Sequence, residues 1–132
     1  MKKILFMFSL LFVLSVSGIA QTLSTFTGTD TVTNTATVNL TLSVKGSYDN
    51  VVFQVVNTKL SGTAAGTSIL YGSVDGINYK AIGADTLTNT NQTTNFHQWR
   101  ISNPDFPYYK IATVGSGTMS VITSAKAHFK KK

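Results

Sequence analysis

The side chains that could carry out acid–base or nucleophilic chemistry are few and widely spaced in this sequence. It contains two histidines, His97 and His128, and five aspartates, but no glutamate or cysteine. A nucleophilic triad needs a Ser, Cys or Thr beside a His and a carboxylate, and no serine lies in a Gly-x-Ser-x-Gly turn. Glycoside hydrolysis needs two facing carboxylates, whereas Asp49, Asp75 and Asp105 fall in predicted turns. The sequence therefore predicts no catalytic residues and a protein that is not an enzyme.

Metal binding is not indicated by the residue spacing either. No histidine pair or cysteine cluster has the spacing of a zinc site, and we expect no metal and no cofactor. Asp75 and Asn78 could donate oxygens to a calcium ion. An aspartate at the start of a tight turn more commonly accepts hydrogen bonds from its own backbone, so we predict that role for Asp75.

Aromatic side chains are better candidates for function, because they combine a large apolar face with polar edges. Two of them, Tyr108 and Tyr109, are neighbours in a predicted strand, so one should point into the core and the other outward. Trp99 lies in mid-strand, where a single Trp is commonly packed between two sheets; core packing is its preferred interpretation. The aromatic candidates are Tyr71, Tyr79, Trp99, Tyr108 and Tyr109.

Any ligand site is expected at the loop ends of the fold, where polar side chains converge with the outward tyrosine. The predicted ligand-binding residues are Tyr108, Trp99, His97, Arg100 and Asn91, with Asn89 and Gln92 close by.

The element that should position these residues is a β-hairpin in residues 68–83. Two apolar and aromatic runs flank Asp75 and Gly76. Asp-Gly suits a two-residue hairpin turn because glycine adopts positive φ without steric cost. We therefore predict that Asp75 and Gly76 form such a turn.

Alternation with a period of two predicts several further strands. Residues 31–45 alternate valine and leucine with threonine, which predicts one strand, or two strands broken near Asn34. Residues 51–59 are apolar on both sides and predict a central strand. Residues 96–101 place His97, Trp99 and Ile101 on one face and Phe96, Gln98 and Arg100 on the other.

The rest of the chain supplies loops and the last strands. Residues 84–95 contain repeated Thr-Asn steps and little that could be buried, which predicts the longest surface loop. Residues 108–114 and 118–129 predict the final two strands. Strands at this regular spacing are typical of an all-β fold, a single antiparallel β-sandwich of seven to eight strands.

Residues 1–20 predict a Sec-type signal peptide. They contain a basic start, an apolar stretch over residues 4–16, and small residues before a cleavage site after Ala20. The alternative is a membrane anchor, but the apolar run is at the lower limit for crossing a bilayer. We expect an exported protein, periplasmic or extracellular, with no stable membrane span after cleavage. The predicted organisation is a signal peptide (1–20), a β-sandwich domain (21–129) and a basic C-terminal tail (130–132).

The positive charge lies mostly outside the predicted domain. Of the formal charge of +6, five lysines belong to the leader and to the tail. The domain between them is nearly neutral, so we expect no nucleic-acid partner. The terminal lysines either form a solvated end that discourages edge-to-edge pairing of the last strand, or contact anionic surfaces such as phosphate-rich glycans.

Two Asp-Thr-apolar triplets are possible modification sites. Thr31 follows Asp30 and Thr86 follows Asp85, and both triplets look like the sequon for periplasmic O-glycosylation in Bacteroidetes. A glycan there would add bulk and solubility at a strand end and a loop. In a chain this rich in threonine, a three-residue pattern also arises by chance.

The order of motifs resembles small jelly-roll or discoidin-like β-sandwiches, and more closely the β-sandwich surface proteins of tailed phages that infect Bacteroidetes. The resemblance is carried by residues 71–79 (Tyr-Gly-Ser-Val-Asp-Gly-Ile-Asn-Tyr), Trp99, residues 107–111 (Pro-Tyr-Tyr-Lys-Ile) and residues 117–119 (Gly-Thr-Met). It implies a jelly-roll-like fold and an accessory subunit on a capsid or tail, with nothing catalytic. The signal peptide departs from this pattern, since phage capsid proteins assemble in the cytoplasm.

Two functions follow as hypotheses. The first is a virion-associated decoration or attachment protein, a homo-oligomer whose partners are other virion or surface proteins. The second is a secreted bacterial carbohydrate-binding protein or adhesin whose partner is a cell-surface glycan. The first predicts a broad protein interface, and the second a monomer with a sugar-sized aromatic cleft.

Overall fold

The computed structural model describes residues 25–44 and 46–131, so the predicted signal peptide lies outside the described residues. In the described part of the chain we find no apolar helix of membrane-spanning length. The strands are β1 (Thr25–Thr33), β2 (Thr37–Ser43), β3 (Tyr48–Gly62), β4 (Gly66–Ser73), β5 (Lys80–Asn89), β6 (Thr94–Ser102), β7 (Tyr108–Gly115) and β8 (Met119–Lys131).

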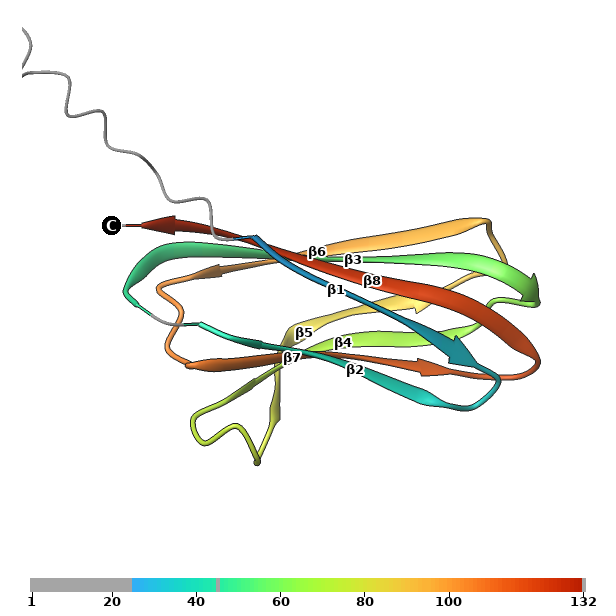
Figure 1. The fold of residues 1–132 in the computed structure, drawn as a ribbon, viewed down its shortest axis with the longest axis horizontal. Coiled ribbons are helices and arrows are strands. Elements are labelled where there is room, and N and C mark those ends of the chain that lie inside the picture. Colours follow the sequence, from blue (N-terminus) through green and yellow to red (C-terminus); the bar gives the residue numbers. More distant parts are fainter. Residues whose placement is uncertain (1–24, 45, 132) are drawn as a thin grey trace, which may run out of the picture.

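The strands form two four-stranded antiparallel sheets that pack face to face (Figure 1). Sheet A has the order β1-β8-β3-β6, and sheet B has the order β2-β7-β4-β5. Successive strands thus alternate between the sheets except at the β4–β5 hairpin, which is the arrangement of a jelly roll. The predicted antiparallel, jelly-roll-like sandwich is confirmed, with eight strands.

The alternating stretch at residues 31–45 forms two strands, as one of the two alternatives predicted. The chain turns at Asn34, whose φ is 50°, and crosses from β1 in sheet A to β2 in sheet B. Asparagine tolerates this left-handed conformation better than most residues. Val32 and Val38, on either side of the turn, are both buried between the sheets.

The core is built from the predicted inward positions. β3 lies between β8 and β6, as its apolar residues on both sides predicted. Alternate side chains of β3 and β8 are buried, so each strand covers the interior with one face. The main core cluster contains Val44, Val51, Phe53, Val55, Leu70, Trp99, Tyr109, Ile111, Ala125, Ala127 and Phe129.

A chain of polar side chains also crosses the interior and joins the sheets. Asn57 of β3 donates from its amide to Ser68 Oγ of β4 (3.0 Å) and to Asn89 Oδ1 of β5 (2.8 Å). Ser68 Oγ lies 2.9 Å from Thr113 Oγ1 of β7, which lies 3.1 Å from Thr123 Oγ1 of β8. All five side chains are buried. Hydrogen bonds among them offset the cost of removing these groups from water.

The prediction of a long surface loop at residues 84–95 was wrong. β5 runs to Asn89 and β6 starts at Thr94, so only residues 90–93 connect them. The short turn is closed by Asn95, whose Oδ1 accepts from the Thr90 backbone N–H (3.1 Å) and whose Nδ2 donates to the Thr90 carbonyl (2.9 Å). Partly buried Leu87 packs against the core, so this polar stretch is the edge strand of sheet B.

The end of the last strand also lies further along the chain than its alternation predicted. β8 continues through Lys131, and Lys130 is paired with Asn50 of β3. Lys130 and Lys131 are therefore strand residues with exposed side chains, beyond the boundary expected at Phe129.

Candidate functional site

Trp99 occupies the core, as its preferred interpretation predicted. It is buried, and its indole Nε1 donates a hydrogen bond to the Asp85 carbonyl of β5 (3.0 Å). Because β6 belongs to sheet A and β5 to sheet B, this bond links the two sheets at one edge of the sandwich. Its ring is therefore not presented to a ligand.

The other predicted ligand-binding residues are not brought together. His97 packs against Trp99, with ring centroids 4.8 Å apart at 72°, while Arg100 lies on the opposite face of β6. Asn91 stabilises a connection: its Oδ1 accepts from Lys59 Nζ (3.1 Å) and from the Ala64 N–H (3.3 Å).

Asn91 and Tyr108 lie near opposite ends of the sandwich. Asn91 precedes the start of β6, whose Thr94 pairs with Thr58. Tyr108 follows the end of β6, whose Ser102 pairs with Asn50. Thr58 and Asn50 are eight positions apart on β3, or about 27 Å of extended chain. The structure thus does not form a single site from the predicted set.

Three of the candidate tyrosines do gather, on the outer face of sheet B. Register pairs Tyr71 of β4 with Lys110 of β7, and the Lys110 Nζ lies 5.2 Å from the Tyr71 ring centroid and 4.4 Å from that of Tyr79. Such contacts are cation–π interactions. Of the neighbours Tyr108 and Tyr109, one was predicted to point outward and the other into the core. Tyr108 points outward and Tyr109 is buried, so this prediction is confirmed. We call Tyr71, Tyr79, Tyr108 and Lys110 the tyrosine face.

A projecting turn borders the tyrosine face. β4 ends at Ser73 and β5 begins at Lys80, so residues 74–79 form the turn, which extends away from both sheets (Figure 1). The hairpin is present, and Asp75 and Gly76 lie in its turn, but the predicted two-residue turn was wrong. Gly76 does adopt a positive φ, of 74°.

The carboxylate of Asp75 holds the projecting turn in shape. Its Oδ1 accepts from Ser73 Oγ and from the N–H groups of Ile77 and Asn78, each at 2.8 Å. Its Oδ2 accepts from Asn78 Nδ2 at 2.7 Å. The two backbone bonds are the main reason why the pKa of Asp75 lies well below its usual value. Asp75 thus bonds its own backbone, and its oxygens are occupied by these donors.

The turn exposes two apolar side chains. Val74 is 72% exposed and Ile77 is 81% exposed. On the side towards sheet B, the Gly76 backbone packs against the Tyr108 ring, since a Cβ built at Gly76 would lie 3.4 Å from that ring. The projecting turn and the tyrosine face therefore form one continuous surface.

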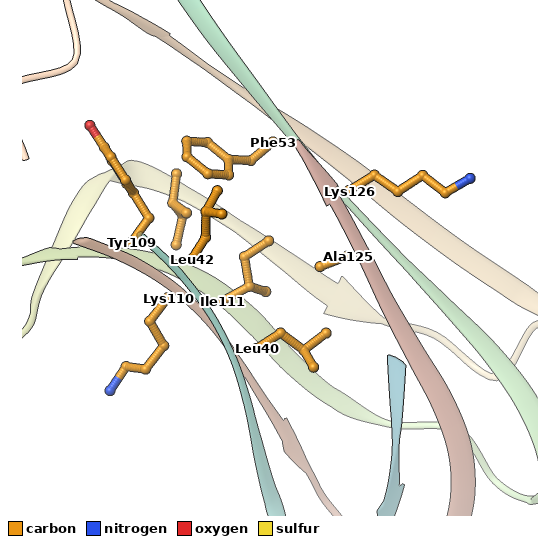
Figure 2. Close-up of a pocket in the computed structure, with 9 residues that line it drawn as sticks. Leu40, Leu42, Phe53, Tyr109, Lys110, Ile111, Ala125 and Lys126 are labelled. Atoms are coloured by element: carbon orange, nitrogen blue, oxygen red, sulfur yellow. The ribbon is translucent and has the colours of Figure 1, made fainter. Parts of the chain in front are cut away.

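The described side chains leave little open space between the two sheets. A gap of about 10 Å³ lies among Leu40, Leu42, Phe53, Leu70, Tyr109, Ile111 and Ala125, which is no more than the space for one water molecule. In Figure 2, the apolar side chains fill this region, while Lys110 and Lys126 point away from it in opposite directions. This gap is too small for a ligand, so the outer faces and the loops are the candidate binding surfaces.

The groups capable of acid–base chemistry remain dispersed in the described residues. His97 is on the inner face of sheet A and His128 on the outer face. In residues 25–44 and 46–131, no three His, Cys, Asp or Glu side chains are arranged to hold a metal ion. The structure forms no catalytic or metal-binding constellation from the residues it describes.

Thr31 and Thr86 lie on the edge strands β1 and β5, and both side chains are exposed. The Asp30 carboxylate accepts a hydrogen bond from the Thr31 N–H at 2.7 Å. Both threonines are therefore accessible to a modifying enzyme, and glycosylation of either remains a prediction.

No protein-family model matches the chain, and no curated protein is similar to it in sequence. Several solved structures are similar in fold. The propeptide form of the Bacillus licheniformis lipase BlEst2 is 14% identical, with a TM-score of 0.57 over 87% of this chain and 24% of the lipase. The Yersinia pseudotuberculosis-derived mitogen is 14% identical, with a TM-score of 0.53 over 83% of this chain and 89% of the mitogen.

A family 16 carbohydrate-binding module is 9% identical, with a TM-score of 0.48 over 70% of each chain. At these identities the similarity to the lipase and to the mitogen supports the β-sandwich fold alone, and it does not distinguish a phage protein from a bacterial one.

Proposed function

We propose that this chain is an exported, non-catalytic binding protein that docks onto another protein of a surface assembly through the projecting turn and the tyrosine face. In its finer form, the proposal is an accessory subunit on the capsid or tail of a tailed phage, used for decoration or attachment. The observation that carries it is the exposure of Val74 and Ile77 on a turn that is held in shape by Asp75.

Rigidity and exposure together favour docking over a chance surface feature. Scattered exposed apolar residues are common on proteins. Here, two of them lie within one short turn whose backbone is fixed by the Asp75 carboxylate. Because the turn is already fixed, Val74 and Ile77 lose little conformational entropy when they bind a partner. More of the free energy gained by burying their side chains therefore contributes to the affinity.

The tyrosine face suits the rim of such an interface. Tyrosine and its neighbouring cation can contact both apolar and polar groups of a partner, and tyrosine is enriched at interfaces. Four edge strands, β1 and β6 in sheet A and β2 and β5 in sheet B, also leave backbone groups available. Association through an edge would stabilise a fold that contains no disulfide, which supports a homo-oligomer.

A secreted carbohydrate-binding protein or adhesin is the second candidate. Tyr71, Tyr79 and Tyr108 share one outer face, and aromatic faces can pack against the apolar side of a sugar ring. The surface is broad and borders a projecting turn, whereas a sugar site was expected to be a cleft. This difference favours protein docking.

The first test is the state of the native protein in its producing culture. Intact mass and sizing of the particle and soluble fractions should find the protein in the particle fraction, or in another large complex. A free monomer that begins at Gln21 would refute the assembly proposal and favour the secreted carbohydrate-binding protein.

The docking surface is tested with a matched pair of variants. Val74→Ser with Ile77→Ser should release the protein from the assembly, while its folding, followed by circular dichroism, should be unchanged. Leu60→Ser is the control, because Leu60 is 56% exposed on β3, outside the projecting turn. Equal loss of association in both variants would show that the projecting turn has no specific role.

A further inference from the structure

Basic side chains gather on the outer face of sheet A, the side of the molecule opposite to the tyrosine face. On β8, alternate residues Ala125, Ala127 and Phe129 are buried, so the residues between them point outward. On β6, buried Trp99 likewise places Arg100 outward. The outward basic residues are Lys126, His128 and Lys130 of β8 and Arg100 of β6.

Register aligns these basic side chains on both sides of the central strand β3. Val52 of β3 pairs with His128 on one side and with Arg100 on the other. Asn50 and Gln54 lie two residues from Val52 in the two directions along β3. Asn50 pairs with Lys130, and Gln54 pairs with Lys126. The cations thus border a track whose floor is β3.

The track is hollowed. One hollow of about 250 Å³ is lined by Asn50, Val52, Arg100, His128 and Lys130. A second, of about 240 Å³, is lined by Val52, Gln54, Gln98, Lys126, Ala127 and His128. Because Val52 and His128 belong to both, the hollows form one shallow groove. We call it the basic groove. Its open shape suits an extended chain better than an enclosed small molecule.

Among the described residues, no partner neutralises the charges of the basic groove. In the part of the chain that the structure describes, the side chains of Arg100, Lys126, His128 and Lys130 have no ion pair and no hydrogen bond. At one end of the groove, the Asp49 Oδ2 accepts a hydrogen bond from Asn50 Nδ2 at 3.3 Å. Unpaired cations of one sign on one face attract anionic ligands.

Amide and aromatic groups continue the groove beyond the cations. Gln98 Nε2 donates to Gln54 Oε1 (2.8 Å), which leaves the Gln54 amide N–H groups and the Gln98 carbonyl oxygen to bond hydroxyls of a ligand. Phe96, the next outward residue of β6, is 68% exposed and pairs with Val56. From Asn50 to Val56, β3 spans about 20 Å.

We propose that the basic groove binds an acidic polysaccharide. The cations would pair with its carboxylate or sulfate groups, the amides with its hydroxyls, and the Phe96 ring with the apolar side of a sugar ring. Single-stranded nucleic acid is the less favoured polyanion, because its non-specific binding uses several aromatic side chains as stacking platforms, and the described side chains of this face expose one, Phe96. The proposal does not depend on the docking surface, which lies on the other sheet.

The test uses the purified full-length mature protein and alginate, a linear polyuronate, with uncharged dextran as the comparison. Affinity is measured by calorimetry or by retardation in alginate-containing gels, at low and high salt. Alginate should bind, dextran should not, and the affinity should fall as salt rises. Lys126→Gln with Lys130→Gln should weaken alginate binding about tenfold, as expected from loss of two contacts of about 0.7 kcal/mol each.

The matched control removes the same charge elsewhere. Lys59→Gln with Lys80→Gln changes two lysines outside the groove, one on β3 and one on β5, and should leave alginate binding within twofold. Equal loss in both double variants would refute a defined site and indicate general charge attraction. Absence of alginate binding, or equally tight binding of a single-stranded DNA oligomer, would also overturn the proposal. The Val74→Ser, Ile77→Ser variant should keep alginate binding, so failures of the two proposals are distinguishable.

Discussion

Thr113→Val is expected to destabilise the fold although it keeps the size and shape of the side chain. Thr113 is fully buried, and its hydroxyl lies between Ser68 Oγ at 2.9 Å and Thr123 Oγ1 at 3.1 Å. Valine removes this hydroxyl from the middle of the polar chain. Ser68 keeps its bond from the Asn57 amide, but Thr123 loses the one side-chain partner it has among the described residues.

The magnitude follows from what is left unpaired. A buried polar group without a partner costs about 1–3 kcal/mol, so Thr113→Val should lower the free energy of unfolding by about 2 kcal/mol. Thr123→Val should cost about 1 kcal/mol, because the Thr113 hydroxyl then still bonds Ser68. The double variant leaves no unpaired hydroxyl at position 123. It should therefore cost about 2 kcal/mol, about 1 kcal/mol less than the sum of the single changes.

Urea unfolding measures these differences. Trp99 is the chain's one tryptophan and is buried, so its fluorescence reports global unfolding, and far-UV circular dichroism provides a second probe. The reasoning would be refuted by costs that add to within about 0.4 kcal/mol. It would also be refuted by a Thr113→Val variant as stable as the natural protein, because the hydroxyl would then contribute nothing.

Three further predictions test the hairpin and the core. Gly72→Ala should destabilise the fold by about 1–3 kcal/mol in thermal melts, because its Cβ would lie 2.6 Å from the Phe106 ring; an unchanged melting temperature would contradict this packing. The hydrogen-bonded carboxylate of Asp75 has a lowered pKa, so its stabilisation of the turn should be complete above about pH 4 and be lost as the pH falls further. The protection factor of the Asn78 amide against exchange, relative to the intrinsic rate at each pH, should then fall, and a constant protection factor down to pH 2 would argue against it. Burial raises the pKa of Tyr109, so the folded state binds this proton more tightly and stability should fall as the pH rises above about 10. A Tyr109→Phe variant should lose less stability over that range, and equal losses would assign the effect to other groups.

Strands with an apolar alternation could be predicted from the sequence because one buried face imposes a period of two. This holds for β8, where every second residue from Met119 to Phe129 is buried. It also holds for β3, whose apolar residues on both sides fit its central place in sheet A. In these segments, the residue types alone specify which face is inside.

The polar interior could not be predicted, because its residue types favour loops when they are considered locally. Asn89 and Asn95 lie in a Thr-Asn-rich stretch that indicated a surface loop, yet both are buried. Asn89 is accommodated because Asn57, distant in the chain, donates to it at 2.8 Å. Burial of such a group depends on a partner that only the tertiary structure supplies.

The candidate surfaces were missed for a similar reason, since each depends on strand register. Tyr71 and Tyr79 were recognised as candidates, but Lys110 joins them only because β4 pairs with β7 so that Tyr71 is opposite Lys110. Arg100 was assigned to a loop-end site with Trp99, although alternation along β6 already placed these two side chains on opposite faces. That alternation was the available signal, and pairing with β3 then places Arg100 across from His128.

The two proposed surfaces have different chemistry and lie on different sheets, which determines how they could act together. Lys110 of the tyrosine face and Lys126 of the basic groove extend from the interior in opposite directions (Figure 2). A partner protein on one face would therefore not cover the other, and the gap found among the described core residues between them holds no more than about 10 Å³. Occupation of the two sites should be simultaneous and independent. Taken together, the two proposals predict that this small domain links a protein assembly to an acidic polysaccharide without a change of conformation.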